Sequence, residues 1–190
     1  MLYLASQSPR RHALLQQLGV AFEVVDVNVP EMRRPDESPC GYVERVARAK
    51  AQAGWQAMSV RDPAAVVLGA DTEVVLDDRV FGKPRDADAA AAMLRALSSR
   101  THRVISIVCC ARAGAAEVVV CESEVTFTDL DEDAIARYVA TGESFGKAGG
   151  YAIQGRAAGF IEHLSGSYSG VMGLPLFETA ALLRRAGREL

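Results

Sequence analysis

Long apolar runs and a strong net charge are both missing from this sequence. Apolar runs such as residues 64–68 are only a few residues long, whereas a membrane-spanning helix needs roughly 20. The 190 residues include 21 basic and 24 acidic side chains, so the formal net charge is −3 and no global positive field attracts nucleic acid or anionic lipid. The sequence therefore predicts neither a membrane protein nor a nucleic-acid-binding module. Any phosphate must be bound by a local cluster of cations.

A secretory signal and a metal-binding cysteine pattern are lacking as well. In the N-terminal segment MLYLASQSPRR the apolar residues precede the arginines, whereas a secretory signal places its basic residues first. We therefore expect a cytoplasmic protein. There is no C-x-x-C pair and the three histidines lie far apart, so no zinc ligand set is recognisable. We expect reduced, packed thiols at all four cysteines, which are Cys40, Cys109, Cys110 and Cys121.

Hydrophobic patterns alternate between the periods of strands and helices. They predict strands over residues 2–5, 21–27, 64–71, 104–111, 117–128 and 160–164, and a hairpin of residues 73–76 and 77–80. They predict helices over residues 9–18, 41–53, 87–97, 131–139 and 175–185. Gly54 is expected to end the second helix, and Asp86 to cap the third.

The order of these elements indicates the fold class. Helices alternate with strands in the first half of the chain and strands pair in the middle, which predicts an α/β protein with a mixed β-sheet. No internal repeat or low-complexity linker interrupts the chain. A single domain over residues 1–190 is therefore expected.

Five polar loops follow the strand-like segments, and each carries groups suited to a nucleoside polyphosphate. They are residues 6–11, 69–72, 81–84, 147–155 and 166–175. The first joins two arginines to a helix start, where backbone amides and guanidiniums can bind phosphate oxygens. The second places Asp71 at the end of a buried strand, where open α/β sheets bind ligands. Taken singly, the loops also fit a solvated arginine pair, a turn cap at Asp71 or a flexible glycine loop.

Five segments carry a resemblance to a known family. These are LASQSPRR, GADT, GKPRD, KAGGYAIQG and GSYSGVMGLPL, in this order along the chain. Together they resemble the Maf-type nucleoside triphosphate pyrophosphatases, and the resemblance runs from end to end. It implies an elongated mixed sheet with flanking helices and two lobes around a nucleotide cleft, similar to the inosine triphosphatase group.

The resemblance also implies a reaction and a set of site residues. The expected reaction is hydrolysis of a nucleoside triphosphate between the α and β phosphorus atoms, with a divalent cation, Mg or Mn. Asp71 matches the catalytic base or metal-linked carboxylate, and Glu31 a second acidic group near the metal. The residues that match phosphate contacts are Ser8, Arg10, Arg11, Lys50 and Lys83. A homodimer is the assembly that the resemblance suggests.

Substrate choice within the family depends on Arg11, Thr72 and Gln154, which resemble the pattern of members acting on dTTP and UTP. Modified pyrimidine nucleotides fit the same pattern. The amide of Gln154 can accept a hydrogen bond from N3–H of uracil or thymine and donate one to a ring oxygen. The chain departs from the family pattern at Gly170, where asparagine is frequent, and at Glu73, where an apolar residue is usual. Neither departure is expected to touch the chemistry directly.

An alternative function is a non-catalytic, nucleotide-sensing regulator of cell division and septum formation. Such a protein would use the same cleft without hydrolysis. Asp71 argues against it, because a carboxylate among phosphate-binding cations repels the ligand unless a metal ion bridges them. The enzyme is therefore the favoured hypothesis.

Overall fold

The computed structural model describes residues 1–189, within which seven strands form one mixed sheet in the order β2-β1-β3-β5-β6-β7, with β4 paired to β3. The strands are β1 (Leu2–Ala5), β2 (Glu23–Val24), β3 (Val66–Leu76), β4 (Arg79–Phe81), β5 (Thr101–Arg112), β6 (Ala115–Phe127) and β7 (Ile161–Ser165). The helices are α1 (Pro9–Gln17), α2 (Pro39–Met58), α3 (Ala87–Leu97), α4 (Glu132–Ala140), α5 (Tyr168–Met172) and α6 (Leu176–Arg185), with short 3-10 helices η1 (Ala148–Gly150) and η2 (Arg156–Phe160). The predicted α/β class with a mixed sheet is confirmed. Among the described residues, no helix combines the length and the apolar character needed to cross a bilayer.

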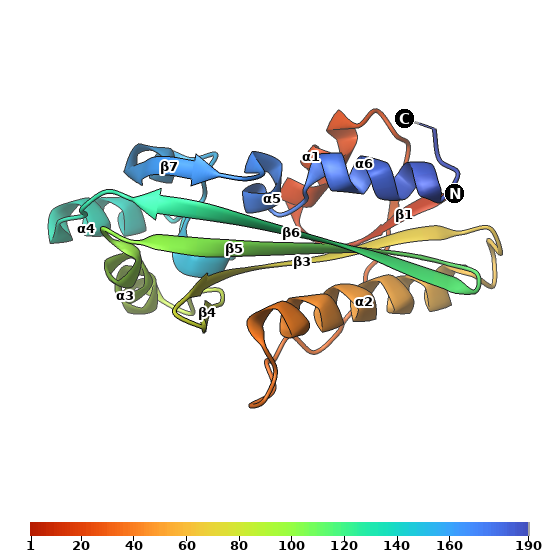
Figure 1. Ribbon diagram of the computed structural model, residues 1–190, viewed down its shortest axis with the longest axis horizontal. Helices are drawn as coiled ribbons and strands as arrows, with labels where there is room; N and C mark the ends of the chain where they lie inside the picture. The colour runs from red at the N-terminus through yellow and green to blue at the C-terminus, as the bar shows by residue number, and fades with distance from the viewer. Residues whose placement is uncertain (190) are drawn as a thin grey trace.

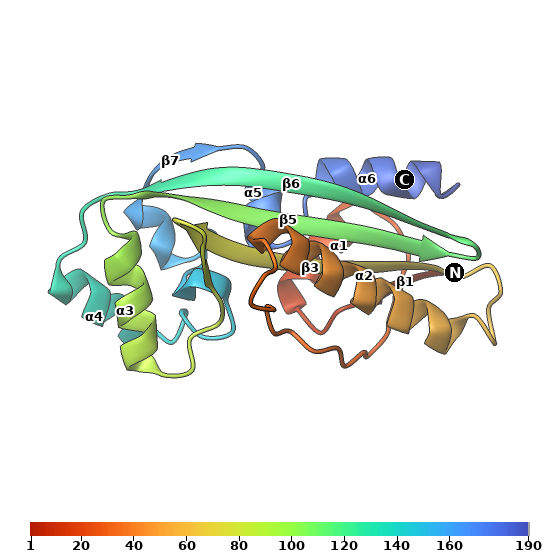
Figure 2. The same cartoon turned by 60° about the horizontal axis from the view of Figure 1, so that its bottom comes forward.

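The long antiparallel strands β3, β5 and β6 give the molecule its elongated shape (Figure 1). Helices α1 and α6 lie against one face of the sheet and α2 against the other, while α3 and α4 gather at the opposite end (Figures 1 and 2). The core follows this division. One apolar cluster, which includes Leu94 and Ile135, lies at the α3 and α4 end, and another, which includes Leu15 and Leu183, lies under α1 and α6.

One edge of β3 changes its partner along its length. Strand β1 pairs with it in parallel as far as Ala5 opposite Gly69, and β4 pairs with it in antiparallel fashion from Val74 onward. Between these pairings, residues 70–73 have no strand partner on that side within the described chain, although β5 pairs with them on the other side. The sheet therefore has an opening at this edge.

Two predicted boundaries are wrong for the same reason, which is that packing outweighs a local signal. Helix α2 does not end at Gly54 but continues to Met58. A Cβ atom on Gly54 would lie 2.8 Å from Cγ1 of Val67, so the glycine allows close packing of α2 on β3. Likewise the GADT segment is not the end of a strand or a turn, because β3 runs without a break through Asp71.

Other expectations have mixed outcomes. The predicted hairpin forms from β3 and β4, with Asp77 and Asp78 at φ values of 49° and 61°, as a two-residue turn of the I′ type requires. Asp86 caps α3 by accepting a hydrogen bond from the amide of Ala89. The predicted second strand is only two residues long, because β2 lies at the edge of the sheet and pairs only with Tyr3 and Leu4 of the short strand β1. The four cysteines are free thiols, as expected.

Candidate active site

A cavity of about 400 Å³ lies at the opening beside β3. Parts of all five predicted loops reach its wall. Every site residue expected from the sequence lies there, namely Ser8, Arg10, Arg11, Glu31, Lys50, Asp71, Thr72, Lys83 and Gln154. Their sequence separations reach well over 100 residues, so the fold gathers them into one place.

The loop after β1 brings the first group of residues to the cavity. The residues of β1 are buried in the sheet, and the chain stays buried through Ser6 and reaches the surface at Gln7. Pro9 then starts α1, where its lack of an N–H group has no cost. The hydroxyl of Ser8 makes no capping hydrogen bond in the described structure, although Ser8 is the residue before the helix. This hydroxyl and the first turn of α1 therefore remain available to an anion.

A lysine links two of the acidic residues. Lys50 lies on α2 with only 7% of its surface exposed, and its ammonium donates to Oδ1 of Asp71 at 2.8 Å. The same ammonium lies 2.6 Å from Oε1 of Glu31, whose other oxygen accepts from Lys83 at 3.1 Å. Burial raises the pKa of Glu31, but the hydrogen bonds and charges of the two lysines outweigh this and lower it to about 2. Glu31 is therefore a carboxylate at neutral pH.

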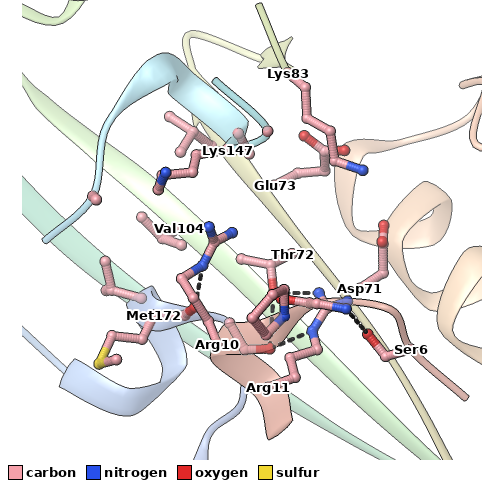
Figure 3. A pocket seen from close by; sticks show the side chains of 18 of the residues that line it. Ser6, Arg10, Arg11, Asp71, Thr72, Glu73, Lys83, Val104, Lys147 and Met172 are labelled. Carbon is pink, nitrogen blue, oxygen red and sulfur yellow. Dashed lines mark hydrogen bonds between the residues drawn. The ribbon is translucent and has the colours of Figure 1, made fainter. Parts of the chain in front are cut away.

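Two buried carboxyl oxygens on β3 have no hydrogen-bond partner among the described residues. Residues i and i+2 of a strand point to the same face, so Asp71 and Glu73 lie side by side. Neither Oδ2 of Asp71 nor Oε2 of Glu73 has a hydrogen-bond partner among residues 1–189, and both are buried. Burial and then the charge of Asp71 raise the pKa of Glu73 to about 8. Glu73 lines the cavity beside Lys83 (Figure 3), so this departure from the family pattern lies within the candidate site.

The acidic side chains of the cavity suit a hard divalent cation that takes only some of its ligands from the protein. Within the described residues, no three acidic, histidine or cysteine side chains are grouped closely enough to hold an ion unaided. Mg²⁺, however, is usually bound by one or two carboxylates together with water and substrate phosphates. The buried, unbonded oxygen of Asp71 and the ionised Glu31 fit that kind of site.

Cations also line the wall opposite Lys83. Figure 3 shows Arg10 and Lys147 on this side, and Nε of Arg10 donates to the carbonyl of Met172 at 3.3 Å. Burial lowers the pKa of Lys147, and the charge of Arg10 lowers it further. Lys147 was not among the site residues predicted from the sequence, although its place at the head of the glycine-rich loop was an available signal. Two cations of like charge side by side indicate a site for an anion.

The glycine-rich loop is fixed to the sheet by a close backbone approach. Gly149 has φ of 70°, and a Cβ atom there would lie 2.8 Å from a methyl group of Val74. Its amide donates to the carbonyl of Gly82. Only glycine combines this positive φ with so short a contact. The loop therefore brings both Lys147 and the exposed residue Gln154 to the cavity wall.

Arg11 is held at two points. Its Nε donates to the carbonyl of Gly173 at 2.8 Å, and its Nη2 donates to Oγ1 of Thr72 at 3.2 Å. Burial lowers the pKa of Arg11, whereas the charge of Asp71 raises it. Arg11 and Thr72, two of the three residues expected to determine substrate choice, are thus hydrogen-bonded to each other. The cavity as a whole contains five basic and three acidic side chains, a balance that favours a polyanion.

Comparisons with known proteins place the chain among named relatives. A protein-family model described as "Maf-like protein" matches residues 1–186. A protein of Xanthomonas oryzae pv. oryzae (strain MAFF 311018) named dTTP/UTP pyrophosphatase is 62% identical over 190 residues, which cover 98% of this chain and 99% of that protein. A protein of Xylella fastidiosa (strain 9a5c) named nucleoside triphosphate pyrophosphatase is 60% identical over 186 residues, covering 96% and 97%.

Proposed function

This chain belongs to the Maf family, and on that premise we propose that it is a nucleoside triphosphate pyrophosphatase acting on dTTP and UTP. The products are the nucleoside monophosphate and pyrophosphate. Modified pyrimidine nucleotides are included among the proposed substrates. One observation carries the proposal: residues expected from five separate sequence segments meet in a single cavity with cations on opposite walls.

The basic side chains bind the triphosphate. Ser8, Arg10 and Arg11 reach the cavity from α1 and the loop before it, while Lys83 faces them from the loop after β4. Guanidiniums hold phosphate oxygens through paired N–H donors, and the ammonium adds a point charge. Lys50 is also proposed to face phosphate, although its ammonium is bonded to Asp71 and Glu31 in the described structure. Its first effect is to hold these two carboxylates in place.

Asp71 is proposed as the general base or, in the alternative role, as the carboxylate that holds the cation. Oδ1 is fixed by Lys50, so the unbonded Oδ2 is the oxygen that can accept a proton from water. The water oxygen forms a bond to the α phosphorus, the bond from that phosphorus to the bridging oxygen breaks, and pyrophosphate leaves with the electron pair. Catalysis of this kind depends on positioning and charge neutralisation rather than on a covalent nucleophile.

A divalent cation, Mg or Mn, is the proposed cofactor, held by Asp71 and Glu31 together with substrate oxygens. When bound, it would neutralise charge that develops on the phosphates. Support comes from the chemistry of the donors, because an unbonded carboxylate oxygen beside a polyphosphate repels it otherwise.

The remaining proposals concern selection of the base, assembly and location. The Gln154 amide would form hydrogen bonds with N3–H and a ring oxygen of uracil or thymine. Arg11 and Thr72 would also contribute to the selection of this nucleobase. A homodimer in the cytoplasm, with neither a nucleic-acid nor a membrane partner, is proposed as well. The non-catalytic regulator is disfavoured by the carboxylates in the cavity.

The test is a panel of nucleoside triphosphates assayed with Mg²⁺ or Mn²⁺, with products separated by chromatography. We expect dTTP and UTP to yield monophosphate and pyrophosphate. Release of diphosphate and orthophosphate would refute the assignment, as would a clear preference for 7-methylguanosine triphosphate. Nucleotide binding without hydrolysis would support the regulator.

A further inference from the structure

A buried serine lies directly behind the Arg11 and Thr72 pair. Ser106 is on β5 opposite Thr72 in the sheet register, with 1% of its surface exposed. Its Oγ is 2.7 Å from the carbonyl oxygen of Gly170 and 2.8 Å from Oγ1 of Thr72. A buried hydroxyl with two such short contacts is part of a defined network and not merely filling space.

Counting protons gives this network a direction. A carbonyl oxygen can only accept, so the single proton of the Ser106 hydroxyl goes to Gly170. The short contact between the two hydroxyls then requires Thr72 to donate to Ser106. The oxygen of Thr72 is left to accept from Nη2 of Arg11. The bonds therefore run in one sequence from Arg11 through Thr72 and Ser106 to Gly170.

Thr72 has one other acceptor within reach, and using it would disturb Arg11. The carbonyl of Gly173 lies 3.3 Å from Oγ1 of Thr72, a longer contact than that to Ser106. That carbonyl already accepts from Nε of Arg11 at 2.8 Å. Without Ser106, the Thr72 proton would turn toward Gly173, whose carbonyl oxygen can accept a second hydrogen bond, and Oγ1 of Thr72 would shift to shorten this contact. Ser106 thus holds Oγ1 of Thr72 in the position from which it accepts from Nη2 of Arg11.

We propose that Ser106 is a positioning residue for substrate selection, which acts through Thr72 to fix the Arg11 guanidinium at the cavity wall. This inference rests on the proposed function, in which Arg11 and Thr72 select the nucleotide. An arginine has five N–H donors, and the two supports use two of them. The other N–H donors can form hydrogen bonds with the substrate only in the orientation that the bonds to Gly173 and Thr72 impose.

The first variant is Ser106→Ala, assayed for kcat/KM with UTP and with GTP. Loss of one hydrogen bond of ordinary strength predicts that the UTP to GTP ratio falls about five- to tenfold. The change should lie in KM for UTP more than in kcat, because Arg11 holds the substrate and does not react. An unchanged ratio in a folded Ser106→Ala protein overturns the proposal. If this variant does not fold, Ser106→Cys carries the test, with a smaller fall expected from its weak donor.

Ser123→Ala is the matched control. Ser123 is also a buried serine, 2% exposed, but on β6, where its Oγ accepts from the amide of Ser167 at the start of α5. Its loss disturbs the helix that contains Gly170 without removing a bond to Thr72. We expect a lower melting temperature and an unchanged UTP to GTP ratio. An equal fall in both variants would mean general loosening of α5 and would refute a specific role for Ser106.

Two further measurements decide whether Ser106 acts through Thr72. In a Thr72→Val background, adding Ser106→Ala should not change the ratio again, and a second fall of equal size overturns the proposal. The NMR signal of the Arg11 Nε–H group, assigned by its loss in Arg11→Lys, should shift in Ser106→Ala and not in Ser123→Ala. This signal needs no substrate. If the wild-type enzyme does not prefer UTP, the proposed function fails, while an unmoved signal refutes the positioning role.

Discussion

Replacing Asp71 with asparagine should separate a chemical role from a structural one. Asp71 lies on a central strand with 6% of its surface exposed, and its Oδ1 is 2.8 Å from the Lys50 ammonium. Asparagine keeps the size and one acceptor oxygen but removes the charge. If Asp71 is the base or the metal carboxylate, kcat should fall by about 10² to 10⁴, the range typical of a lost general base.

The cost in stability can be estimated from the same contacts. Removing one partner of a buried ion pair costs about 3–5 kcal/mol when the other charge is left alone. Here Lys50 keeps Glu31 at 2.6 Å and gains the asparagine oxygen in place of Oδ1. We therefore expect a smaller loss of unfolding free energy, about 1–3 kcal/mol. The variant should fold at room temperature.

Both quantities must be measured on one Asp71→Asn preparation, by thermal unfolding and by pyrophosphate release. KM should change less than kcat, because Arg10, Arg11 and Lys83 still bind phosphate. Normal turnover in the folded variant would remove Asp71 from the mechanism. Loss of activity in strict proportion to loss of folded protein would likewise show a structural role.

Three other outcomes are expected. Complete chelation of divalent cations should abolish pyrophosphate release and added Mg²⁺ should restore it, so full turnover in excess chelator would refute the cation requirement. Lys147→Met should raise KM for UTP about tenfold with a smaller change in kcat, and an unchanged KM would exclude a phosphate contact. Burial lowers the pKa of His102 to about 4, below its unfolded value of about 6.5. The unfolded chain therefore binds the extra proton first, and the free energy of unfolding should drop by up to about 3 kcal/mol between pH 6.5 and 4. His102→Gln should flatten this slope, as urea titrations at several pH values would show.

The fold was predictable where short-range periodicity decides the structure. Strand and helix patterns, the turn at Asp77 and Asp78 and the cap at Asp86 are local, and the structure has them. Gly54 failed as a stop signal because the contact that explains it is with Val67, on another element. Local propensity yields to tertiary packing at such positions.

The candidate site was predictable as a set of residues but not as a set of bonds. The family resemblance predicted that Lys50, Asp71 and Glu31 belong to one site. Only the tertiary arrangement shows that the lysine forms ion pairs with both carboxylates. Ser106 was missed for a related reason. It looks like an ordinary strand residue until the neighbouring strand and loop are in place.

The opening at the edge of β3 has a consequence for how the site can change in evolution. From Gly69 to Val74 the strand rises five steps, or about 16 Å at 3.3 Å per residue. The length of this gap is set by where β1 and β4 stop pairing, and not by any side chain that lines it. Substitutions of side chains that line the cavity can therefore alter which nucleotide is accepted while the unpaired stretch of β3 keeps its length. A one-residue extension of β1 would instead shorten this stretch for every substrate at once.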